Sequence, residues 1–88
     1  MSENHDPSEA IGTVTHYFSH LSVAAIGLAQ PLSVGERIHI IGHTTDVVET
    51  VGSMQIEHRS VDAASPGDDV AINVTEHVRE HDQVFREA

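Results

Sequence analysis

Apolar side chains recur at every second position along most of this chain, and this periodicity most constrains its fold. In the stretch "IGTVTHYF", Val14, His16 and Phe18 fall on one face of an extended strand. In "ERIHII", Ile38 and Ile40 share a face in the same manner. A period of two is typical of β-strands, because successive side chains of an extended chain point to opposite faces. The sequence therefore predicts an all-β fold.

The remaining segments complete the predicted set of strands. Residues 21–29, "LSVAAIGLA", are apolar on both faces, as in a strand that is covered on each side. Residues 47–58 read as one long strand whose phase changes at Gly52, which predicts a β-bulge. The turn signal "SPGDD" precedes a strand over 70–74. The segment 76–87 has too few apolar residues for a packed helix, so we expect a loop and a short closing strand.

Six such strands predict a closed β-barrel, because closure removes the unpaired edges along which sheets aggregate. The expected organisation is a disordered tail at 1–10 and a single β-barrel domain at 11–88. A chain of 88 residues has room for one modest core. The residues expected to line that core are Val14, Ile38, Ile40, Met54, Ile56, Val70, Ile72, Val74 and Val84.

The charge of the chain bears on its partners. Fourteen acidic residues stand against four arginines, with no lysine, and the formal net charge is −10. The scattered carboxylates favour adaptation to high salt, and a surface for a basic partner is the alternative. Without cysteine, a P-loop lysine or a long apolar run, we expect no thiolate site, no bound nucleotide and no membrane span. A cytoplasmic location is the expectation.

Several motifs resemble those of a known barrel. The patterns "L-x-V-G-E-x-I-x-I-x-G" at 32–42, "V-x-S-M-Q-I" at 51–56 and "A-x-P-G-D-D-V-A-I-N-V" at 64–74 are similar to domain two of elongation factor Tu. The pair "GHTTD" and "MQIEH" resembles small stand-alone translation-elongation-factor-like proteins and the C-terminal barrel of collagenase-like peptidases. The resemblance implies a six-stranded accessory barrel without catalysis. It also implies a partner in translation or RNA modification, which would be a protein, tRNA or the ribosome.

The stretch "GHTTD", residues 42–46, falls between two predicted strands. Glycine, threonine and aspartate are typical turn residues, so a tight turn explains this composition, and a partner-contact loop is the alternative. Catalysis is disfavoured, because no nucleophile signature accompanies the hydroxyls. Arginine and histidine side chains beside the loop are expected to form one positive island. The predicted partner-binding residues are Arg37, His39, His43, Thr44, Thr45, Asp46, His58 and Arg59.

Eight histidines in this short chain raise a second hypothesis, a metal- or pH-responsive binding protein. Metal ligation needs three or four convergent side chains. His39 and His43 have a spacing that brings two imidazoles together on a helix but not on a strand. We therefore expect no metal, no cofactor and no catalytic residue. We expect tRNA binding to be weak, because four arginines neutralise few phosphates.

Overall fold

Ten strands and hardly any helix make up residues 9–87, which are the residues that the computed structural model describes. In chain order the strands are β1 (Gly12–Phe18), β2 (Val23–Leu28), β3 (Leu32–Ser33), β4 (Arg37–Ile41), β5 (Asp46–Thr50), β6 (Met54–Ile56), β7 (Arg59–Val61), β8 (Ala63–Ala64), β9 (Asp69–Asn73) and β10 (Gln83–Arg86). The all-β prediction is confirmed. Most of the predicted tail at 1–10 lies outside the described residues.

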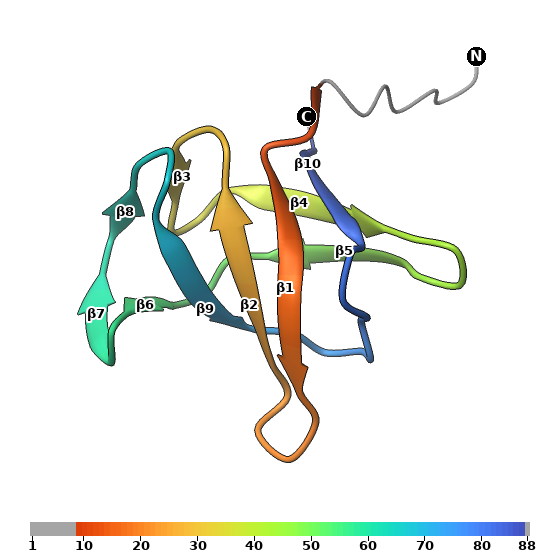
Figure 1. Ribbon diagram of the computed structural model, residues 1–88. Coiled ribbons are helices and arrows are strands. Elements are labelled where there is room, and N and C mark those ends of the chain that lie inside the picture. The colour runs from red at the N-terminus through yellow and green to blue at the C-terminus, as the bar shows by residue number, and fades with distance from the viewer. Residues whose placement is uncertain (1–8, 88) are drawn as a thin grey trace.

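The main sheet has eight antiparallel strands in the order β5-β4-β10-β1-β2-β9-β6-β7, and a second sheet pairs β3 with β8. Figure 1 shows β1, β2 and β9 side by side at the front, with β4 and β5 behind them. The two edges of the order, β5 and β7, are not joined by any ladder within residues 9–87. The fold is a curled, open sheet, or half-barrel, and the prediction of a closed six-stranded barrel is wrong.

The open sheet has a local cause in the predicted long strand at 47–58. That segment is two strands: β5 pairs with β4, whereas β6 pairs with β9 and β7. Between them the chain leaves the sheet, and Val51 turns inward, 1% exposed, while its N–H donates to the Glu36 carbonyl at 2.9 Å. The phase change at Gly52 is therefore a strand break. It sends β5 and β6 toward opposite ends of the strand order.

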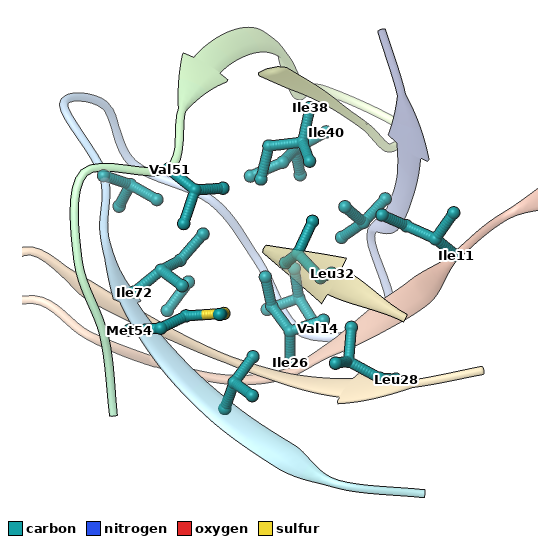
Figure 2. Packing of buried hydrophobic residues seen from close by; sticks show 14 of the residues in the cluster. Ile11, Val14, Ile26, Leu28, Leu32, Ile38, Ile40, Val51, Met54 and Ile72 are labelled. Carbon is teal, nitrogen blue, oxygen red and sulfur yellow. The ribbon is translucent and has the colours of Figure 1, made fainter. Parts of the chain in front are cut away.

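The core fills the concave side of the sheet, and Figure 2 shows its side chains pointing into one common interior. Of the predicted core residues, Ile56 is only partly buried against the cluster, and the others are fully buried. The remaining buried members of the cluster are Ile11, Ala24, Ile26, Leu28, Leu32, Val51, Ala64 and Val78. Strand periodicity thus identified the inward residues of β4, β9 and β10 correctly.

Strand β1 departs from the predicted alternation. Its register on β2 shifts between Val14 and His16, which is the mark of a β-bulge. Val14 points into the core, but beyond the shift it is Tyr17 that packs against the core, and Phe18 is 42% exposed. Val14 and Phe18 therefore lie on opposite faces, contrary to the sequence prediction.

The C-terminal segment behaves as predicted. Instead of a helix, it forms a loop followed by β10, which pairs with both β1 and β4. Within residues 9–87 the structure has no helix with the length and apolar character needed to cross a membrane.

Candidate functional site

The "GHTTD" stretch closes the hairpin between β4 and β5. The Gly42 N–H donates to the Thr45 carbonyl at 2.9 Å, and the Thr45 side chain is buried. His43 and Thr44 are exposed at the tip. The interpretation of this stretch as a tight turn is confirmed.

This hairpin is tied to the loop before β10. Arg79 Nε donates to Thr44 Oγ1 at 3.1 Å, and the Arg79 N–H donates to Asp82 Oδ2 at 2.8 Å. The Asp82 carboxylate is buried directly against Gly42, where an added Cβ would lie 1.8 Å from Oδ1. The motif therefore holds the C-terminal loop in place, and Gly42 is needed because no side chain fits there.

His39 lies on β4 beside the hairpin and faces two carboxylates. Its Nε2 pairs with Asp46 Oδ1, and its Nδ1 lies 3.5 Å from Glu87 Oε1. His39 thus has a carboxylate near each of its ring nitrogens.

The predicted partner-binding residues fall into two separate groups. Arg37 and His39 lie on β4, next to the "GHTTD" turn, whereas His58 lies in the turn between β6 and β7 and Arg59 begins β7. Figure 1 shows these two hairpins on opposite sides of the molecule. The single positive island expected from the sequence is therefore absent from residues 9–87.

A different surface feature stands out on the convex face of the sheet, where β2 and β9 pair. The inner residues of both strands are buried, so Val23, Ala25 and Ala71 point outward, with Ala25 directly opposite Ala71. Small side chains at these central positions leave a hollow between longer neighbours. We call this hollow the trough, and Val23, Ala25 and Ala71 form its floor.

The walls of the trough come from the strands on either side. Phe18 and Leu21 rise from the β1–β2 hairpin, and Gln55 and His58 rise from the β6–β7 hairpin. Two hollows, of about 420 and 220 Å³, share four lining residues and form one continuous depression. Leu21 is 66% exposed. Of the four large apolar side chains exposed within residues 9–87, two thus border the trough.

Both hairpin turns beside the trough hold unfavourable backbone angles. Among residues 9–87, three of the four non-glycine residues with positive φ lie there: Ser22 at 54°, Glu57 at 51° and His58 at 69°. The two-residue turn of Glu57 and His58 has the positive φ angles of a type I′ turn, which normally takes Asn-Gly. Strain of this kind is typical of binding sites, where it fixes side chains for a ligand.

Sequence reasoning missed most of this surface. Of the trough residues, only His58 was among the predicted partner-binding residues. The available signal was the apolar outer face of 21–29, which predicted a strand covered on both sides. In the structure the core covers the inner face alone. The outer face is only half-buried by the trough walls, which is the condition of a docking surface.

Comparisons with known proteins place the chain beside peptidases. It is 43% identical over 76 residues to an uncharacterized protease of Methanocaldococcus jannaschii, covering 85% of this chain and 19% of that protein. It is 35% identical over 78 residues to a collagenase of Porphyromonas gingivalis, covering 86% of this chain and 22% of the collagenase. The chain thus spans about a fifth of the length of the curated relatives it matches. No family model matches the chain.

A solved structure shows the same fold. The crystal structure of the C-terminal domain of a Geobacillus thermoleovorans protein assigned to the U32 peptidases matches with a TM-score of 0.87. The match covers 98% of this chain and 100% of that domain, at 17% sequence identity. The half-barrel therefore exists as a domain that crystallises on its own.

These comparisons correct the functional prediction. The similar proteins are proteases, collagenases and a U32 peptidase domain, so the prediction of a translation-factor module is wrong. The resemblance to the C-terminal barrel of collagenase-like peptidases is supported, whereas the resemblance to elongation-factor-like proteins is not. The histidine-based alternative is not favoured either. Within residues 9–87, no three potential ligands among histidine, aspartate and glutamate gather around one point.

Proposed function

We propose that this chain is a non-catalytic docking domain, the counterpart of the U32 peptidase C-terminal domain, and that it binds a segment of a peptidase-type catalytic partner. The observation that carries this proposal is the trough, an apolar outer face that residues 9–87 cover only in part. The comparisons support it, because the matching sequence is one continuous fifth of much larger proteases.

The test uses the Methanocaldococcus jannaschii protease from which the 76 matching residues have been deleted. Calorimetric titration with this chain is expected to show saturable binding with a dissociation constant of about 1–100 μM, the range of a small interface. Absence of heat and of co-elution at ~100 μM would refute the proposal. The chain alone is expected to cleave no peptide.

Two matched variants assign the binding to the trough. Ala71→Leu fills the floor and is expected to weaken binding about tenfold or more, because it occupies the space of the partner side chain. Ala63→Leu makes the same change at an exposed alanine of β8, outside the trough, and is expected to leave binding unchanged. Equal losses in both variants would place the interface elsewhere.

A further inference from the structure

We infer that the occupant of the trough is an extended polypeptide segment with small or β-branched side chains and a lysine or arginine that reaches Glu57 and Asp69. This inference rests on the proposed function and names the chemistry of the segment that is bound. It follows from the direction of the trough, the size of its floor and the charges at one end.

The direction of the trough indicates an extended chain. Its floor follows β2 and β9 along their length, from the Val23–Asn73 pair to the Ala25–Ala71 pair and on to Gly27 and Asp69. Outward residues two apart on a strand are separated by roughly 6.6 Å, which is also the spacing of same-side residues in an extended peptide. A segment laid along the strands can therefore place successive side chains over successive floor positions, as two facing sheets do.

The floor limits the size of the side chains that fit. Ala25 and Ala71 are the smallest side chains of the floor, and Phe18 lines the same hollow together with Gln55, which pairs with Ala71. The hollow of about 420 Å³ is predominantly apolar. A valine, threonine or alanine side chain of the bound segment, directed at the floor, fits between the walls without moving them. Burial of the apolar surface of the trough then supplies the affinity.

One end of the trough carries unpaired negative charge. Glu57 and Asp69 line the smaller hollow of about 220 Å³, and no arginine lines either hollow within the described residues. Neither carboxylate forms an ion pair or side-chain hydrogen bond with residues 9–87. Asp69 is directed over Gly27, where an added Cβ would lie 3.3 Å from Oδ1. Two unpaired carboxylates beside an apolar floor are complementary to an apolar segment that ends in a cation.

The test uses three capped hexapeptides that alternate valine and threonine at their centre. One has a lysine at each end, one a glutamate at each end and one a serine at each end. Each is titrated into the isotopically labelled full chain at low salt while backbone amide resonances are followed. The lysine peptide is expected to shift amides of 23–27, 55–58 and 69–73 and to bind about three- to tenfold more tightly than the serine peptide. The glutamate peptide is expected to bind most weakly.

Two variants separate charge from shape. The double change Glu57→Gln and Asp69→Asn keeps the volume of both side chains and is expected to remove the preference for lysine over serine. Ala71→Leu is expected to abolish the shifts for every peptide, with its resonance dispersion showing that it is folded. Equal affinity for all three peptides, shifts confined to β5, or self-association of the chain through the trough would overturn the inference. Because the peptides are free in solution, this outcome is independent of whether the protease fragment binds.

Discussion

The tightest constraint on a single residue is the contact between Gly42 and Asp82. A Cβ at Gly42 would lie 1.8 Å from Asp82 Oδ1, and Asp82 is buried with its other carboxylate oxygen bonded to the Arg79 N–H. Gly42→Ala must displace this carboxylate and break its hydrogen bond. We expect the free energy of unfolding to fall by about 1–3 kcal/mol, measured by urea titration.

A second glycine supplies the control for this prediction. Gly52 has no atom within 4 Å of an added Cβ, and its φ is not in the left-handed region. Gly52→Ala is therefore expected to change the free energy of unfolding by no more than about 0.5 kcal/mol. Similar losses at both glycines would mean that the cost at Gly42 arises from the backbone and not from Asp82.

At the scale of elements, β9 lies inside the main sheet, where it pairs with both β2 and β6. Ile72 of this strand is 1% exposed. Ile72→Ala is expected to lower the free energy of unfolding by about 2–4 kcal/mol, because it leaves a cavity in the core. Val48→Ala on the edge strand β5, where the side chain is 40% exposed, is expected to cost less than about 1 kcal/mol. A small effect at Ile72 would contradict the inward assignment of this strand.

The β6–β7 turn offers a test of strain at the binding surface. Replacing Glu57-His58 by Asn-Gly gives the type I′ turn its preferred residues and is expected to raise the free energy of unfolding by about 1 kcal/mol. The same change is expected to weaken binding of the lysine peptide, because it removes a wall and a carboxylate of the trough. A variant that gains no stability would show that the turn is not strained.

The chain contains the control dipeptide for this turn. Glu76-His77 has the same two residues in a loop where neither φ is positive, and the His77 ring lies 4.6 Å from the ring of Tyr17. Asn-Gly at this position relieves no strain and removes the ring contact. We therefore expect the free energy of unfolding to fall here, and a gain at both sites would indicate a general effect of glycine.

The sequence reveals those features of the strands that depend on neighbouring residues, and it does not reveal those that depend on distant segments. Alternation is local, so it identified the strands around Val14, Ile40 and Ile72 and their inward faces. Strands of two or three residues, such as β3, β7 and β8, are too short to show a period. The open sheet and the trough depend on which strands pair across the chain, and His58 and Phe18 line one hollow because β9 pairs with both β2 and β6. No local pattern encodes that pairing.

For the whole molecule, the dominant property is unbalanced negative charge. Only four arginines face fourteen acidic residues, and within residues 9–87 the one arginine–carboxylate ion pair joins Arg86 to Glu36, with 2.7 Å between Nε and Oε1. Most carboxylates therefore repel one another in the compact state, and the repulsion is screened within about 3 Å at 1 M salt. We expect the thermal midpoint to rise between 0.05 and 1 M sodium chloride, by about 4–8 °C for each kcal/mol gained.

Added salt should stabilise the fold and weaken recognition of the lysine peptide, because it screens repulsion and attraction alike. Asp62→Asn with Glu76→Gln removes two exposed carboxylates that lie outside the trough, so this variant is expected to have a higher midpoint at low salt and a smaller gain at 1 M. Its preference for the lysine peptide over the serine peptide should remain at low salt, because Glu57 and Asp69 are intact.

At 1 M salt the preference for the lysine peptide should disappear in the native chain, although its fold is then more stable. Thermal scans and peptide titrations across one salt series measure both effects. A midpoint that does not respond to salt would show that repulsion is not a material term in the stability of the fold. A lysine preference that survives 1 M salt would show that the end of the trough recognises the peptide by shape and not by charge.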